Sequence, residues 1–132
     1  MSNAAHLALL RELAASGVKF VTIGSAGLVL LGEPHTLHDV DLVLGPGELG
    51  AFAAWALRRG TLTVWGEPWS GEWNERALTG KFYVRAVIDG LQCDATFEFP
   101  YDVRTLLRDA RVIDGIPVCP EAVLRESRAL RP

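Results

Sequence analysis

The chain has 132 residues, of which 49% are hydrophobic and 22% charged, a composition typical of a folded protein and not of a disordered one. Its length predicts a single domain over residues 1–132. No apolar run has the length of a membrane span, no signal-peptide pattern is found, and the two cysteines form neither a zinc spacing nor a disulfide framework. We therefore expect a cytoplasmic protein without membrane association. The net charge of −3 argues against broad electrostatic capture of nucleic acid.

The first elements alternate between helix and strand. An apolar stripe over residues 4–15 predicts a helix that ends before Gly17. The nearly all-apolar run 18–23 is typical of a strand buried on both faces. A second helix, apolar all round and therefore buried, is predicted over residues 26–31, with Ser25 placed to act as its N-cap.

The next strand carries two acidic residues. Residues 38–44 form an apolar run interrupted by Asp39 and Asp41, although aspartate is depleted in strands. Because side chains alternate along a strand, the two carboxylates share one face, where they repel each other. A hard divalent cation between them would relieve that repulsion. The helix predicted after this strand, over residues 48–57, turns Leu49, Phe52, Ala53 and Leu57 inward.

The middle of the chain contains three tryptophans at helical spacing, Trp65, Trp69 and Trp73, among Gly, Pro, Ser and Asn. A packed helix face or a folded loop is one interpretation of this segment. The other is a lid over a ligand or a surface for a protein partner. The sequence leaves both open.

The last part of the chain predicts two hairpins. Asp89-Gly90 joins the alternating runs 81–88 and 91–98, and a two-residue turn there pairs Arg85 with Asp94. Asp94 then points away from the apolar face. Asp114-Gly115 joins two short strands, the second limited by Pro117 to a sheet edge or a strand start, and a helix over residues 120–130 closes the chain. These elements predict an α/β (α+β) fold with helices flanking a mixed sheet.

Three features in this order resemble the nucleotidyltransferase superfamily, and its minimal, single-domain members most of all, including those of toxin–antitoxin systems. They are Gly24-Ser25 at a strand-to-helix turn, Asp39-x-Asp41 on the next strand, and Asp94 on a later one. The resemblance implies a nucleotidyltransferase-like mixed sheet. It also implies transfer of a nucleoside monophosphate from a nucleoside triphosphate such as ATP to a hydroxyl of RNA, protein or a small molecule.

The resemblance also implies roles for single residues. Asp39, Asp41 and Asp94 would bind Mg²⁺, or Mn²⁺ in its place, and act in catalysis. Gly24 and Ser25 would hold the triphosphate, since glycine lets the backbone approach closely and a helix start favours an anion. Lys81 and Arg85 are candidates for binding phosphate, although solvent-exposed strand charges are equally common.

Some residues depart from the family pattern. His35 and His38 stand where many relatives have an Arg, and Arg125 and Arg128 stand where many have a Lys. The alternative function is therefore a catalytically weak or inactive protein of this fold. Such a protein would bind or regulate a partner through the tryptophan segment, as in a toxin–antitoxin pair. For Asp94, the ordinary alternative to a metal ligand is a cross-strand ion pair with Arg85.

Overall fold

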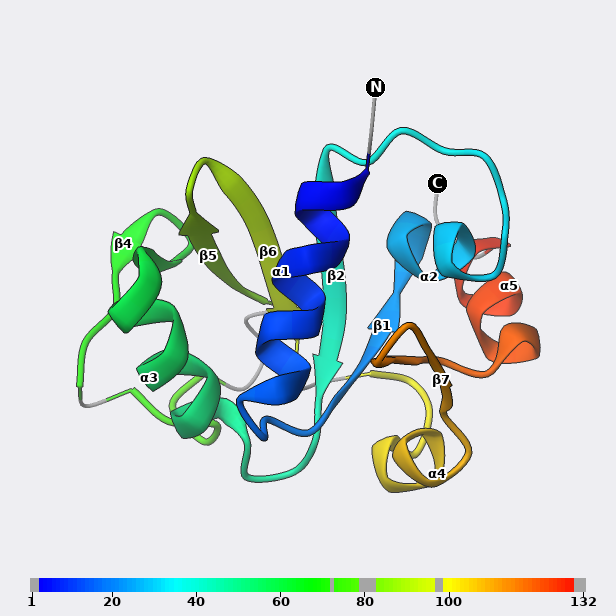
Figure 1. Cartoon of the computed structure of the whole chain (residues 1–132). Coiled ribbons are helices and arrows are strands. Elements are labelled where there is room, and N and C mark those ends of the chain that lie inside the picture. The colour runs from blue at the N-terminus through cyan, green and yellow to red at the C-terminus, as the bar shows by residue number, and fades with distance from the viewer. Residues whose placement is uncertain (1–2, 72, 79–82, 97–98, 130–132) are drawn as a thin grey trace.

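The fold is built on one eight-stranded mixed sheet. The computed structural model describes residues 3–71, 73–78, 83–96 and 99–129. Its strands follow the order β4-β3-β5-β6-β2-β1-β8-β7, with β2 parallel to β6 and β1 parallel to β8. The predicted class of mixed sheet and flanking helices is confirmed (Figure 1). None of the helices within these residues is long and apolar enough to cross a bilayer.

Within the described residues, five helices and eight strands are found, with helices and strands alternating at first and strand hairpins following. The helices are α1 (Ala4–Ala15), α2 (Gly24–Leu30), α3 (Leu49–Arg59), α4 (Val103–Arg108) and α5 (Glu121–Ala129). The strands are β1 (Phe20–Ile23), β2 (Asp39–Leu44), β3 (Thr61–Val64), β4 (Glu67–Pro68), β5 (Val84–Ile88), β6 (Leu91–Thr96), β7 (Arg111–Ile113) and β8 (Ile116–Val118).

The sheet is covered unequally on its two faces. On one face, Val40, Leu42 and Leu44 of β2 belong to the large core cluster that also contains the buried side chains of α1 and α3. On the other face, Val21, Ile23 and Val43 form a smaller cluster with one buried leucine from each of α2, α4 and α5: Leu28, Leu106 and Leu124. Asp39 and Asp41 share the face of Val43, as the alternation predicts. Their end of β2 therefore lies on the face with the smaller core.

The β5–β6 hairpin has the predicted register. Ile88 pairs with Leu91 and Arg85 with Asp94. Asp89 and Gly90 have φ values of 52° and 78°, the left-handed conformation that a two-residue turn of this type requires. The turn chemistry alone therefore determined which residues of this hairpin lie opposite each other.

The second hairpin forms as predicted, and of the two positions expected for Pro117, a sheet edge or a strand start, the sheet edge is wrong. Strand β8 lies between β1 and β7, so it is not an edge strand. Proline is tolerated because the pairing of β8 with β1 starts after it, at Val118 opposite Thr22. The amide of Cys119 then donates to the carbonyl of Thr22 at 3.0 Å. The missing amide hydrogen of the proline costs no bond to β1 in this register.

Two details of the helices also differ from the prediction. Helix α2 begins at Gly24 with Ile23 as its N-cap, so Ser25 lies inside the first turn and is not the cap. In α3 the inward positions include Trp55 and Ala56, whereas Leu57 is 50% exposed. The buried stripe of α3 therefore excludes Leu57 and includes Trp55, whose ring lies in the large core. The Nε1 of Trp55 donates to Glu12 of α1 at 2.9 Å, so burial leaves this polar group with a partner.

The tryptophan segment is a folded loop with a short hairpin and not a helix face. Trp65 and Gly66 both have positive φ and form the turn between β3 and β4. Trp69 and Trp73 pack edge to face with ring centroids 5.7 Å apart, against the large core. Trp65 is 60% exposed. Only one of the three tryptophans thus presents most of its surface to solvent.

Candidate active site

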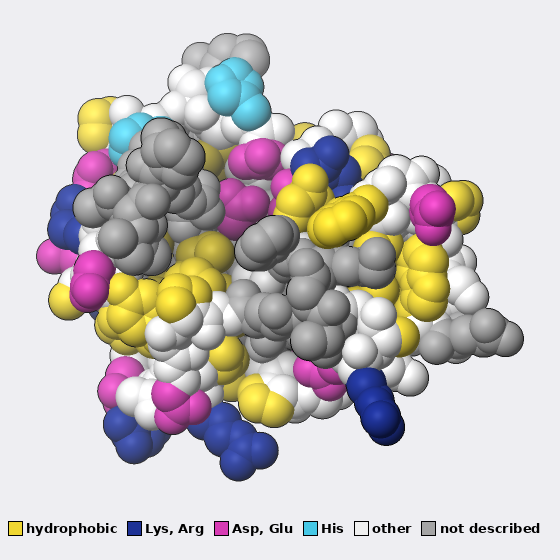
Figure 2. All heavy atoms as spheres, turned by 180° about the vertical axis from the view of Figure 1, so that it is seen from behind, with side chains coloured by type: hydrophobic (Ala, Val, Ile, Leu, Met, Phe, Trp, Pro, Cys, Tyr) yellow, Lys and Arg dark blue, Asp and Glu magenta, His cyan; other side chains and the backbone are white. Residues whose placement is uncertain are grey.

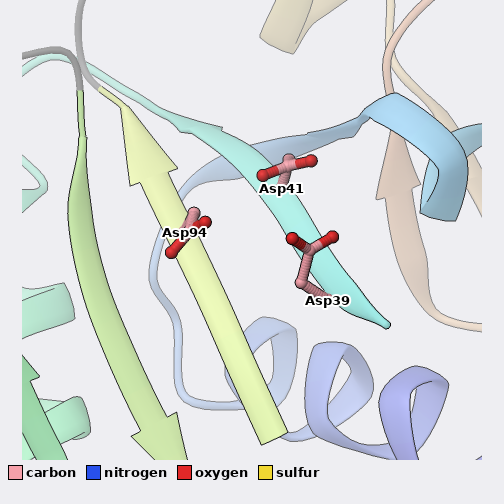
Figure 3. A group of neighbouring side chains, drawn as sticks. All are labelled: Asp39, Asp41 and Asp94. Atoms are coloured by element: carbon pink, nitrogen blue, oxygen red, sulfur yellow. The ribbon is translucent and has the colours of Figure 1, made fainter. Parts of the chain in front are cut away.

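Three carboxylates from two neighbouring strands converge on one face of the sheet. Parallel pairing of β2 and β6 places Asp41 opposite Asp94 and Asp39 opposite Gln92. Asp39, Asp41 and Asp94 each offer an oxygen, and these oxygens all lie within 4.8 Å of one another (Figure 3). Asp94 is 9% exposed and the other two are half-buried. The sequence predicted this set of residues, and the parallel pairing brings them together.

The predicted phosphate-binding turn lies directly beside this cluster. Strands β1 and β2 are antiparallel, so β1 ends where β2 begins and Ile23 pairs with Asp41. The next residue, Gly24, has φ +66°. A Cβ at Gly24 would lie 2.9 Å from Oδ2 of Asp41. The backbone angle therefore favours glycine here, and a Cβ would also displace the carboxylate of Asp41.

Arg85 of the adjacent strand β5 binds the third carboxylate. Its Nε donates to Oδ1 of Asp94 at 2.9 Å, and its Nη2 donates to Oδ2 at 3.2 Å. This interaction raises the pKa of Arg85 above its usual value. Asp94 thus faces Asp39 and Asp41 while it is paired with Arg85, so the ion pair does not remove Asp94 from the carboxylate cluster.

Two further residues near the carboxylates carried no separate signal in the sequence. Gln92 lies two residues before Asp94, on the same face, and its Nε2 donates to Oδ2 of Asp94 at 3.1 Å and to Oδ2 of Asp39 at 3.4 Å. Tyr83 accepts a hydrogen bond from Arg85 at 3.3 Å, and its ring lies 5.2 Å from the guanidinium carbon. The hairpin register could have pointed to Gln92, since it fixes the face on which Gln92 lies.

The other candidate residues lie elsewhere or outside the described part. Lys81 is not among the described residues, and neither is the side chain of Arg128. His35 is 3.5 Å from Glu33, and His38 is exposed in the segment that leads into β2. Arg125 of α5 forms an ion pair with Glu33 at 2.7 Å. Neither histidine nor Arg125 belongs to the three-carboxylate cluster.

The two cysteines belong to the core and take no part in this site. Both are buried and free. Burial is the main cause that raises the pKa of Cys93, and burial raises the pKa of Cys119 to about 11. Each thiol therefore stays protonated at neutral pH, the behaviour of a small apolar side chain and not of a nucleophile.

Seen from the side opposite to Figure 1, acidic side chains gather in a hollow of the surface beside a cationic and an apolar group (Figure 2). In the close-up, the three labelled aspartates project from neighbouring strands toward a common space (Figure 3). Oxygen donors on rigid strands can hold a hard cation. They lie next to the turn at Gly24 and Ser25, of which Gly24 is buried and Ser25 is half-buried.

Comparison with known proteins gives a likeness in structure only. No protein-family model matches the sequence, and a search of curated proteins finds no match. A crystal structure from Thermotoga maritima, described as that of "a putative nucleotidyltransferase", is similar with a TM-score of 0.70 and 17% sequence identity. The match covers 98% of this chain and 86% of the other. At this identity the likeness concerns the fold, and the chain has a nucleotidyltransferase-like fold.

Proposed function

We propose that this protein is a divalent-metal-dependent nucleotidyltransferase that moves a nucleoside monophosphate from a nucleoside triphosphate to a hydroxyl group. The observation that carries the proposal is the convergence of Asp39, Asp41 and Asp94 within 4.8 Å, beside the Gly24 turn. The fold is consistent with it, since the similar Thermotoga maritima protein is described as "a putative nucleotidyltransferase".

The donor set fits Mg²⁺ or Mn²⁺. All three side chains offer carboxylate oxygens, the ligands that hard divalent cations prefer. Three carboxylates and the single guanidinium of Arg85 leave a formal charge of −2 at the cluster, from −3 and +1. A divalent ion would balance that charge. When bound, it would neutralise the negative charge that the triphosphate brings and that the leaving pyrophosphate develops.

Each residue of the candidate site would have its own role in the transfer reaction. Asp39, Asp41 and Asp94 would hold the ion, and the backbone at Gly24 and Ser25 would approach the phosphates closely. Asp94 would accept the proton of the acceptor hydroxyl as its oxygen forms a bond to the α-phosphorus. The bond from the α-phosphorus to the bridging oxygen then breaks, and pyrophosphate leaves with that electron pair. Most of the rate enhancement in such transfer comes from positioning and charge neutralisation.

The test is transfer of a labelled nucleoside monophosphate with release of pyrophosphate, measured with and without Mg²⁺. We expect turnover only with the metal, no turnover in Asp39→Asn or Asp41→Asn, and a loss of about 10²–10⁴-fold in Asp94→Asn. Asp109→Asn is the control, because Asp109 pairs with its neighbour Arg108 on the surface. Wild-type protein that binds neither Mg²⁺ nor any triphosphate would contradict the proposal.

The ion pair at Asp94 supports a second candidate, a catalytically weak protein that binds nucleotide or regulates a partner. Arg85 occupies both oxygens of the carboxylate that would take the proton. A protein partner, such as one encoded alongside in a toxin–antitoxin pair, would contact the exposed Trp65. For this candidate we expect the protein to bind a triphosphate without releasing pyrophosphate. We also expect Trp65→Ala to lose binding of the partner. Trp69 and Trp73 are unsuitable for this test because they pack against the core.

A further inference from the structure

Asp94 is nearly saturated with hydrogen bonds from side chains of this chain. Its Oδ1 accepts one bond from Arg85, and its Oδ2 accepts one from Arg85 and one from Gln92. A carboxylate offers roughly four lone-pair sites, so these three bonds leave about one. Asp94 can therefore give a cation little more than one lone pair while Arg85 stays in place.

The guanidinium also opposes a cation by its charge. Arg85 remains protonated under all ordinary conditions, and its interaction with Asp94 raises its pKa further. Its side chain is 38% exposed and that of Asp94 is 11% exposed, so solvent screens the pair only in part. A second positive charge beside Asp94 is repelled by the first.

Tyr83 and Gln92 hold this arrangement from two sides. The Tyr83 hydroxyl accepts from Nη2 of Arg85, and its ring faces the guanidinium. Gln92 connects Oδ2 of Asp94 with Oδ2 of Asp39. Both contacts order the groups around the carboxylates without adding negative charge, so they favour the geometry in which Arg85 is the counter-ion of the cluster.

We propose that Arg85 is a built-in counter-ion that competes with the divalent metal for Asp94 and thereby sets the metal affinity of the site. The proposal rests on the proposed function, because it takes the carboxylate cluster as the metal site. It gives Arg85 a role other than phosphate binding. Arg85 is a positioning residue here, because it acts through Asp94. It lowers the affinity of the site for the divalent metal, and it stabilises the carboxylate cluster when no metal is bound.

The chain offers a closely matched control. Arg59 of α3 forms the same forked ion pair with Glu12 of α1, with contacts of 2.7 and 2.9 Å. The side chain of Arg59 is 38% exposed, as is that of Arg85. Arg59→Met removes one positive charge and one forked pair, as Arg85→Met does, but at a carboxylate outside the cluster. The Arg59→Met variant therefore shows how much of any change in metal affinity comes from the net charge of the protein and not from competition at Asp94.

The experiment measures Mn²⁺ binding by calorimetry at neutral pH and constant ionic strength for wild type, Arg85→Met, Arg85→Lys and Arg59→Met. We expect the dissociation constant of Arg85→Met to fall about tenfold, which corresponds to about 1.4 kcal/mol. Arg85→Lys keeps the charge but loses the fork, so its affinity should lie between wild type and Arg85→Met. Arg59→Met should bind as the wild type does.

A second readout is independent of turnover. Without metal, Arg85→Met should melt below wild type, since the buried Asp94 loses its partner, and added Mn²⁺ should close the gap. If the wild type binds Mn²⁺ and both Arg85 variants bind it no more tightly than the wild type does, the proposed role of Arg85 is wrong. The metal site itself is not contradicted by that result. A wild type that binds no Mn²⁺ would overturn the metal site of the proposed function, and this role with it.

Discussion

At the scale of single residues, Gly24 connects the two halves of the candidate site. Its φ of +66° is unfavourable for any side chain, and Oδ2 of Asp41 fills the space that a Cβ would need, at 2.9 Å. A rigid backbone position thus lies against a carboxylate that would hold the metal. A side chain at this position would therefore displace the carboxylate of Asp41.

We expect Gly24→Ala to lower the free energy of unfolding by about 1–3 kcal/mol, from backbone strain and the displaced carboxylate. Urea denaturation measures the loss, and Mn²⁺ titration should show weaker binding because Asp41 moves. Gly17→Ala is the control: Gly17 also has positive φ, +92°, but nothing lies within 4 Å of its would-be Cβ. If both variants bind Mn²⁺ as the wild type does, the contact between Gly24 and Asp41 does not position the site.

Also at this scale, Asp94 shows how one carboxylate can serve two partners. A cross-strand ion pair with Arg85 and a place in the acidic cluster were alternatives on sequence grounds. The structure has both, since the forked bonds come from β5 on one side and Asp41 lies on β2 on the other. A strand in the middle of a sheet exposes each side chain to neighbours on two strands, so one pairing does not exclude the other.

At the scale of elements, the end of α3 is a point of close contact with the sheet. Gly60 follows the helix, and β3 begins at the next residue, beside β5. A Cβ at Gly60 would lie 2.1 Å from the carbonyl oxygen of Val87. The φ of Gly60 is −173°, an extended value open to any residue, so space and not backbone angle requires glycine.

Gly60→Ala should therefore destabilise the protein by about 1–3 kcal/mol or more, because the backbone of β5 has to move. Gly50→Ala, inside α3 with no atom within 4 Å of its would-be Cβ, should instead stabilise by about 0.5–1 kcal/mol. Thermal or urea denaturation of both variants measures the difference. A Gly60→Ala protein as stable as wild type would show that α3 and β5 are not in close contact.

At the scale of the whole molecule, the uneven covering of the sheet decides where a ligand can reach it. One face is closed by α1 and α3 over the large core, whereas the carboxylates lie on the face with the smaller core. Like charges concentrated there oppose folding unless a cation balances them. Metal binding and stability of the whole chain should therefore be linked.

We expect Mg²⁺ to raise the melting temperature of the wild type. A concentration ten times the dissociation constant should add about 1.4 kcal/mol. The double variant Asp39→Asn, Asp41→Asn should show no such rise, and without metal it should be at least as stable as wild type because repulsion is relieved. Asp109→Asn, at a surface ion pair outside the cluster, should respond to Mg²⁺ like the wild type. An equal rise in the double variant would mean that Mg²⁺ acts elsewhere.

Much of the fold could be predicted from local patterns. The turn at Asp89-Gly90 gave the register of β5 and β6, and alternation gave the shared face of Asp39 and Asp41. Helical spacing alone was wrong at Leu57, which has the spacing of the core residues of α3 but lies at the edge of its buried stripe. For the tryptophan segment the sequence left a helix face and a folded loop open, and the structure has the folded loop.

The sequence by itself determined strand β2 with the shared face of its acidic residues and the register of the β5–β6 hairpin, because side-chain period and turn geometry act over a few residues. Strands β3 and β4 and helix α4 were not predicted. Only the tertiary structure decided that β2 lies parallel to β6, that Gly24 contacts Asp41, and that Asp94 is shared with Arg85 and Gln92. The bond between Gln92 and Asp39 joins residues 53 positions apart. Such contacts depend on strand order, which follows from burying the whole core and not from any local stretch of the chain.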